Sequence, residues 1–170
     1  YCLDHIADGK NSAAIVYMRE HPVQPCGECE YICFSGAMCP VKDDMDDIVA
    51  QCIQADMVLW ALPTYRGHLP SAYFSFSERL EGYVQRGIDV ETGILKKVHI
   101  ILIGNLSAGA DIALYEILSE FADKPFCPET VLLSSRDYHR RSIDGDMLEE
   151  EPVRQRLDRF THDILLRIKS

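Results

Sequence analysis

The sequence predicts an α/β fold in which helices cover both faces of a doubly wound parallel sheet. Short apolar runs alternate along the chain with longer segments whose apolar residues recur every three or four positions. In addition, 47% of the 170 residues are hydrophobic, which is enough to form one buried core. We therefore expect a single domain over residues 1–170.

Four apolar runs are predicted to be strands: Ala13–Arg19, Met57–Leu62, Val98–Gly104 and Val131–Ser134. The second is apolar throughout, as is typical of a strand covered on both faces, and Pro63 ends it. The third is also predicted to be buried, with His99 as a hydrogen-bonded core residue. In a doubly wound sheet, ligands bind beyond the carboxyl ends of such strands.

Helices are predicted between these strands and after the last one, over Asp43–Ala55, Pro70–Arg86, Ala108–Ala122 and Glu150–Lys169. The first, third and fourth have apolar residues at helical spacing, and Pro70 is tolerated in the first turn of the second. Acidic residues begin the first and the last, where they complement the positive end of the helix. Tyr1–Gly9 resembles the tail of a helix with no strand before it. A sheet of this kind normally begins with a central strand and a ligand loop, so we expect the given sequence to lack an N-terminal piece.

The composition argues against several kinds of partner. There are 27 acidic and 17 basic residues and a formal charge of −10, which disfavours nucleic acid and anionic membranes. The apolar runs are too short to span a bilayer, and the first ten residues do not resemble a secretory signal. Seven cysteines, an odd number with four in one stretch, indicate a reducing cytosol rather than a disulfide framework. We therefore expect a cytoplasmic protein.

The clustered cysteines are Cys26, Cys29, Cys33 and Cys39, followed by Pro40. Four thiolates at this spacing can ligate a [4Fe-4S] cluster, and a proline after the last cysteine is also found in ferredoxins. Structural zinc sites favour two separated pairs of ligands, although zinc on four thiolates remains an alternative. Four free thiols, or a disulfide, are further alternatives.

Two long stretches resemble the NADPH-dependent FMN reductase and iron–sulfur flavoprotein family: PVQPCGECEYICFSGAMCPVKDDMDDI and ADMVLWALPTYRGHLPSAYFSFSERL. The shared pattern comprises the cluster from Pro25 to Cys39, a helix start at Lys42–Met45, the strand Met57–Leu62, and P-x-Y-x-G at Pro63, Tyr65 and Gly67. The order and spacing match over about half of the chain. Three features depart from the family: its Ser/Arg/Asn/Thr-rich phosphate loop is absent, Phe74 stands where a lysine is common, and Glu78–Arg79 replaces Asp-Arg.

The resemblance implies a flavodoxin-like fold that binds FMN noncovalently. It implies an oxidoreductase that takes a hydride from NAD(P)H and passes electrons to a flavin, a quinone, another small-molecule acceptor or a redox partner protein. It also implies a homodimer or homotetramer. We name no acid or base, because the cofactor carries the chemistry in such a site.

The candidate FMN-binding residues lie in two loops. The first is Pro63, Thr64, Tyr65, Arg66 and Gly67, and the second contains Asn105, Ser107 and Gly109. Gly67 permits close approach of the backbone, Tyr65 offers an aromatic face, and Arg66 can stabilise negative charge. An ordinary turn and a capped strand-to-helix connection are the alternative interpretations.

Two other functions remain alternatives. One is an electron carrier that uses FMN together with a [4Fe-4S] cluster held by the four cysteines. The other is a zinc-stabilised binding domain with no enzymatic activity. The basic run Arg136–Arg141 is a further candidate, either for the 2′-phosphate of NADPH or as a solvated loop.

Overall fold

The computed structural model describes residues 1–7, 11–27, 29–104, 110–141, 144 and 146–168. The chain divides into two compact units. The first comprises Tyr1–Ile15, Leu59–Leu69 and Val98–Ser170, and the second comprises Val16–Val58 and Pro70–Lys97. The single domain over residues 1–170 stays a prediction.

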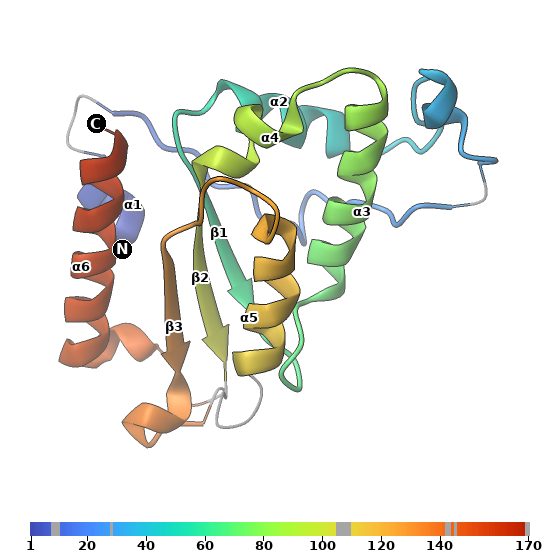
Figure 1. Cartoon of the computed structure of the whole chain (residues 1–170). Coiled ribbons are helices and arrows are strands. Elements are labelled where there is room, and N and C mark those ends of the chain that lie inside the picture. The colour runs from blue at the N-terminus through green and yellow to red at the C-terminus, as the bar shows by residue number, and fades with distance from the viewer. Residues whose placement is uncertain (8–10, 28, 105–109, 142–143, 145, 169–170) are drawn as a thin grey trace. The chain divides into compact units, whose positions relative to one another are not determined.

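A three-stranded sheet forms the centre of the first unit (Figure 1). The sheet has the strand order β1-β2-β3. Its strands are β1 (Val58–Pro63), β2 (Val98–Gly104) and β3 (Thr130–Ser134). Residues Leu59–Pro63 of β1 belong to the first unit. β2 and β3 run parallel, with Ile101 opposite Val131. The bounds of β2 are those predicted from its apolar run.

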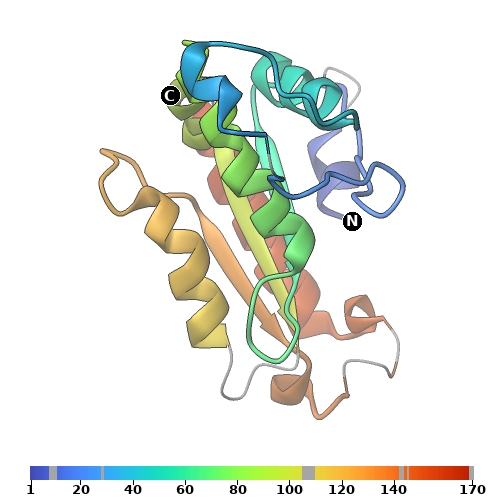
Figure 2. The same ribbon diagram turned by 90° about the vertical axis from the view of Figure 1, so that its right-hand side faces the viewer.

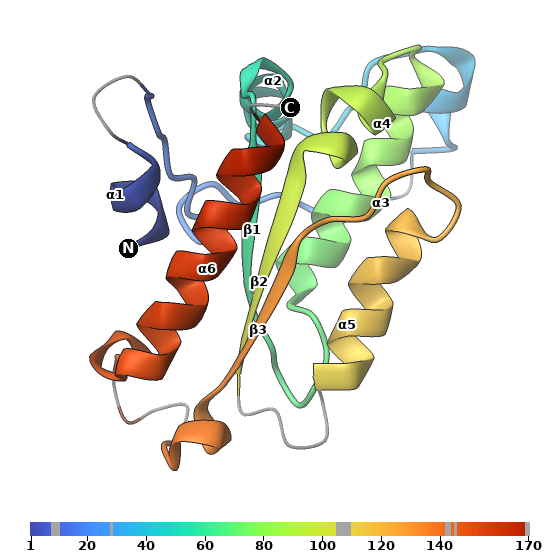
Figure 3. The same cartoon turned by 60° about the vertical axis from the view of Figure 1, so that its left-hand side comes forward.

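Two helices cover the sheet of the first unit on opposite faces, α5 (Ala110–Leu118) on one and α6 (Glu151–Ile168) on the other (Figures 2 and 3). The short helix α1 (Cys2–Ile6) packs against α6. Val153, Leu157, Phe160 and Ile164 form the buried stripe of α6, at the three- and four-residue steps of an amphipathic helix. The predicted α/β fold with helices on both faces, consistent with a flavodoxin-like fold, is confirmed.

The second unit is helical, with α2 (Met45–Gln54), α3 (Ser71–Gln85) and α4 (Val90–Gly93). Single 3-10 turns complete both units: η1 (Ile32–Ser35), η2 (Leu95–Lys97), η3 (Ser119–Phe121), η4 (Ser135–Tyr138) and η5 (Met147–Glu149). A buried ion pair joins Arg79 to Asp43, which also accepts hydrogen bonds from the N–H groups of Gln24 and Met45. These bonds fix the start of α2 against α3.

None of the described helices has the length and apolar character that a membrane span requires.

The prediction of a strand over Ala13–Arg19 is wrong. These residues form coil and a turn, and the side chains of Ile15 and Tyr17 remain 59% and 50% exposed. A β-branched run becomes a strand only where a neighbouring strand accepts its hydrogen bonds and a core covers its side chains. The described part of the chain supplies neither at this segment.

Strand β1 is less buried than its sequence predicted. Its residues alternate between half-buried and exposed towards the carboxyl end, where Ala61 and Pro63 are exposed. The strand stands at one end of the described sheet, whereas β2 lies between two strands and is buried over most of its length. An apolar run therefore identified the strand correctly but not its position in the sheet.

His99 in β2 is buried, at 7% exposure, but the predicted hydrogen bond is wrong for one of its ring nitrogens. Within the described residues, Nδ1 of His99 has no hydrogen-bond partner. Desolvation, reinforced by the nearby positive charge of Arg167, lowers the pKa of His99 from 6.5 to about 4. The imidazole is therefore neutral in the folded protein and takes up a proton on unfolding at mildly acidic pH.

We predict that His99 makes folding sensitive to mild acid. Because its pKa is lowered in the folded state, its contribution to stability is complete above pH 6.5 and declines as the pH falls towards 4. The wild type should lose up to about 3 kcal/mol more unfolding free energy over this range than His99→Leu. Urea unfolding at several pH values measures the difference. His162→Leu, which removes an exposed histidine, is the control, and equal pH dependence in wild type and His99→Leu would contradict the prediction.

Candidate functional site

A tight turn follows the carboxyl end of β1. Tyr65 and His68 exchange two backbone hydrogen bonds, of 2.9 and 3.0 Å, across Arg66 and Gly67. Both central residues have positive φ, +52° at Arg66 and +88° at Gly67, as in a type I′ turn. Glycine adopts positive φ readily, so Gly67 suits this conformation. Arg66 has a Cβ, and positive φ costs such a residue about 1 kcal/mol. Arg66 is therefore held in a conformation that its own backbone disfavours.

Backbone hydrogen bonds fasten this turn on both sides. The N–H of Thr64 donates to the carbonyl oxygen of Ile103 in β2, at 2.8 Å. The N–H of Ala113 in α5 donates to the carbonyl oxygen of Gly67, at 2.9 Å. The neighbouring strand and the helix that follows it thus determine where the turn lies.

Glu116 of α5 provides a third attachment. Its Oε2 accepts a hydrogen bond from the N–H of Leu69 at 2.9 Å, and its Oε1 lies 2.7 Å from Nδ1 of His68. Burial acts to raise the pKa of Glu116, but the hydrogen bonds from His68 and Leu69 outweigh it and lower the pKa below its ordinary value. The carboxylate is therefore ionised at neutral pH.

The turn carries polar and aromatic groups, and of its residues Tyr65 and Arg66 are exposed whereas Gly67 is buried. In the described part of the chain, the N–H groups of Arg66 and Gly67 donate to no protein acceptor. Tyr65 is 65% exposed, and the Arg66 side chain is exposed as well. Further exposed apolar side chains stand on the two elements that fasten the turn: Ile103 on β2, and Ile112 and Tyr115 on α5. A flat ligand with hydrogen-bond acceptors along one edge matches this combination.

The five residues predicted for the first loop are consecutive in the chain, and their role in binding FMN stays a prediction. Pro63 is the last residue of β1, and Thr64, Tyr65, Arg66 and Gly67 follow it into the turn. Asn105, Ser107 and Gly109 lie outside the described residues, so their role stays a prediction. The contacts of Glu116 with His68 and Leu69 were not predicted from the sequence. The sequence shows Glu116 only as an acidic residue next to the apolar stripe of α5, which contains Ala113 and Ile117.

The profile of the family described as NADPH-dependent FMN reductase matches residues 1–122. The chain belongs to the NADPH-dependent FMN reductase family. A curated relative, the "Iron-sulfur flavoprotein" of Archaeoglobus fulgidus, is 26% identical over 142 residues, which cover 81% of this chain and 72% of the relative. No solved structure gives a significant match.

Membership of the FMN reductase family indicates an FMN-dependent NAD(P)H oxidoreductase at the level of the family. The turn at Thr64–Gly67 fits one part of FMN, the polar edge of the isoalloxazine ring. This edge carries carbonyl and ring-nitrogen acceptors, and the N–H groups of Arg66 and Gly67 are unused donors in the described part of the chain. The exposed ring of Tyr65 supplies a flat apolar surface beside them.

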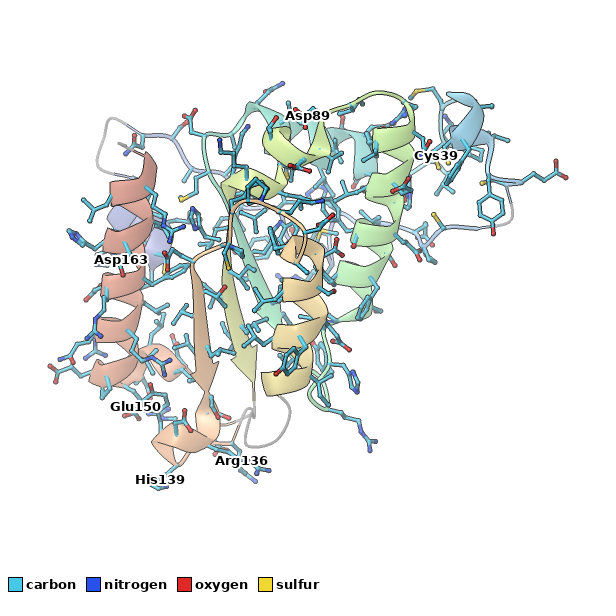
Figure 4. The ribbon with its side chains drawn as sticks, viewed as in Figure 1. Cys39, Asp89, Arg136, His139, Glu150 and Asp163 are labelled. Carbon is cyan, nitrogen blue, oxygen red and sulfur yellow. The ribbon has the colours of Figure 1, made fainter. Side chains whose placement is uncertain are left out.

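The segment Cys26–Cys39, called the cysteine loop, belongs to the second unit, and hydrogen bonds join both of its ends to α3. The N–H of Cys26 donates to Oε1 of Glu78 at 2.5 Å, and Nη2 of Arg79 donates to Sγ of Cys39 at 3.7 Å. Cys39 accordingly lies beside α3 (Figure 4). Glu78–Arg79, noted in the sequence as a departure from the family, thus contacts the first and last cysteines of the cluster.

The four cysteines do not form a preassembled metal site. All are free thiols, and the described residues include no group of three or more His, Cys, Asp or Glu side chains that could hold a metal ion. Partial desolvation, followed by the charge of Glu78, raises the pKa of the Cys26 thiol. The loop as it stands therefore does not fit the predicted [4Fe-4S] or zinc ligand set.

The basic run after β3 is largely neutralised within its own unit. Arg140 pairs with Glu149 and Glu150 at 2.8 and 2.7 Å, and Arg141 pairs with Asp144 at 2.7 Å. Figure 4 shows Arg136, His139 and Glu150 near the carboxyl end of β3. The pairs of Arg140 and Arg141 favour the interpretation of this run as a structural loop over a site for the 2′-phosphate of NADPH.

Gly67 has positive φ, a conformation that favours glycine over other residues. We predict that Gly67→Ala lowers the free energy of unfolding by about 1–2 kcal/mol, because alanine is strained at positive φ. Gly27→Ala is the control for the substitution at an exposed glycine with an open Cβ position and no positive φ, whereas Gly67 is buried. Chemical unfolding monitored by circular dichroism measures both. Equal stability of the two variants would show that the turn tolerates a side chain at position 67.

Proposed function

We propose that the protein is an FMN-dependent oxidoreductase that takes a hydride from NAD(P)H and passes electrons to a flavin, a quinone or another acceptor. The observation that carries the proposal is the fastened turn at Thr64–Gly67, with unused N–H donors and an exposed aromatic ring, in a chain of the FMN reductase family. FMN is held noncovalently by this turn and by the loop containing Asn105, Ser107 and Gly109.

Tyr65, Arg66 and Gly67 each contribute to FMN binding in this proposal. The N–H groups of Arg66 and Gly67 donate hydrogen bonds to the polar edge of the ring, and Tyr65 covers part of its surface. The guanidinium of Arg66 stabilises negative charge on the reduced ring or on a phosphate. When bound, FMN supplies the redox chemistry by accepting a hydride at N5 and giving up electrons to the next acceptor.

The proposal also covers the electron acceptor, the oligomeric state and the location in the cell. We propose a small-molecule acceptor or a redox partner protein, and a homodimer or homotetramer, because the family resemblance implies them. A cytoplasmic location is supported by the seven cysteines, all of which are described and all free.

The visible spectrum of the purified protein tests the proposed function. We expect flavin bands at about 375 and about 450 nm, which NADPH bleaches under anaerobic conditions. FMN should rebind stoichiometrically after removal, and heat-denatured protein is the control for nonspecific binding. A folded, colourless protein that takes up no FMN would contradict the proposal.

Replacing Arg66 tests its role without breaking the turn. Arg66→Asn should keep the turn, because Asn-Gly is the preferred pair in type I′ turns, while it removes the guanidinium. We expect FMN to bind about tenfold more weakly, which corresponds to the loss of about 1.4 kcal/mol of charge-assisted interaction. The control Arg159→Asn removes an exposed arginine from α6. Calorimetric titration measures both affinities, and unchanged affinity and reduction potential in Arg66→Asn would exclude a role for the Arg66 guanidinium in FMN binding.

An electron carrier with FMN and a [4Fe-4S] cluster is the second candidate. The cysteine spacing and the relative named as an iron–sulfur flavoprotein favour it, whereas the arrangement of the four thiols does not. Iron and acid-labile sulfide should both be absent from the anaerobically purified protein if the first proposal holds. About four of each per chain, with reduction by ferredoxin but not by NADPH, would establish the carrier instead. Stoichiometric zinc in a colourless protein would favour the binding domain.

A further inference from the structure

We propose that Glu116 is a positioning residue that holds the Tyr65–Leu69 turn in the shape that receives FMN. This inference rests on the proposed function, because it concerns the same turn. Neither the sequence pattern nor the family comparison indicated a role for this carboxylate.

Glu116 uses both of its oxygens on His68 and Leu69, the last two residues of the Tyr65–Leu69 turn. Oε1 lies 2.7 Å from Nδ1 of His68, and Oε2 accepts from the N–H of Leu69 at 2.9 Å. The two contacts join α5 to a segment that is 47 and 48 residues earlier in the chain. A single side chain therefore fixes both the side chain of one residue and the backbone of the next.

The turn needs such support because its own conformation is unfavourable. Arg66 has φ +52°, which a residue with a Cβ adopts only at an energetic cost. Tyr65 and His68 close the turn with two backbone hydrogen bonds, and Ala113 donates one more to Gly67. Ala113 and Glu116 are three residues apart and so lie on the same side of α5, which makes this helix the support of the turn.

The charge of Glu116 strengthens the support. The lowered pKa keeps the carboxylate ionised, and hydrogen bonds to an ionised acceptor are stronger than those to a neutral one. The side chain is 24% exposed and His68 is 56% exposed, so the contact lies at the surface of the unit. Its loss should therefore loosen the turn while the buried residues of α5, such as Ala113 and Ile117, keep their packing.

Two substitutions separate positioning from general stability. Glu116→Ala removes both contacts. Glu116→Gln keeps a hydrogen-bonding group at both positions without the charge, because the amide oxygen can accept from Leu69 and the amide N–H can donate to Nδ1 of His68. Asp163→Ala, which removes an exposed carboxylate from α6, is the matched control. His68→Ala removes only one contact and serves if Glu116→Ala fails to fold.

The experiment measures FMN affinity by calorimetry and, without FMN, hydrogen exchange at the Leu69 amide. We expect Glu116→Ala to bind FMN about tenfold more weakly and to exchange this amide at least about tenfold faster. Glu116→Gln and Asp163→Ala should stay within about threefold of the wild type in both measurements. His68→Ala should lie between the wild type and Glu116→Ala.

The inference and the proposed function fail in distinguishable ways. Wild-type affinity for FMN in a folded Glu116→Ala would overturn the role of Glu116 and leave the proposed function intact. Weaker binding with unchanged exchange at Leu69 would also overturn it, because the turn would not have been loosened. If the folded wild type binds no FMN, the proposed function falls and this inference falls with it.

Discussion

The fastening of one left-handed turn to β2 and α5 is the constraint on which the candidate site depends. Gly67 adopts positive φ without strain, but Arg66 has a Cβ and adopts it at an energetic cost. The turn is held by a bond from Thr64 to β2, a bond from α5 to Gly67, and the carboxylate of Glu116. Because every attachment lies within the first unit, the sheet and its covering helix are sufficient to define the shape of the turn.

This arrangement connects backbone strain with ligand binding. A rigid turn presents its N–H donors without having to order them when the ligand arrives, so little conformational entropy is lost on binding. Strained residues persist where the surrounding structure holds them, and they gather at binding sites. Arg66 is strained by its positive φ and its side chain is exposed. The N–H of Gly67 next to it has no acceptor in the described part of the chain. The strain is therefore consistent with a role in ligand binding.

The apolar pattern of the sequence predicted the layers of the fold but not the contacts that shape the site. β2 and α6 were found because buried strands and amphipathic helices have distinctive patterns. Ala13–Arg19 shows the limit of that reasoning, since strand pairing depends on neighbours that a local pattern does not contain. The turn residues were located from their place after β1, but the positive φ of Arg66 was not predicted. Glu116 was missed for a related reason, because its partners lie nearly fifty residues away.

The cysteine loop illustrates the difference between a motif and a site. Its spacing predicted metal ligands, yet the structure fastens Cys26 through its backbone and Cys39 through a buried arginine. Arg79 also forms the buried pair with Asp43, so the loop is part of the packing of α2 and α3. Sequence spacing records which residues are near one another along the chain, whereas a ligand set requires their sulfur atoms to converge.

The most direct test of the central claim is a map of backbone amide chemical shifts in the isotopically labelled protein as FMN is added. We expect the largest changes at Tyr65, Arg66 and Gly67, in proportion to the fraction of FMN bound. Saturable binding of FMN that leaves these three amides unchanged would contradict it.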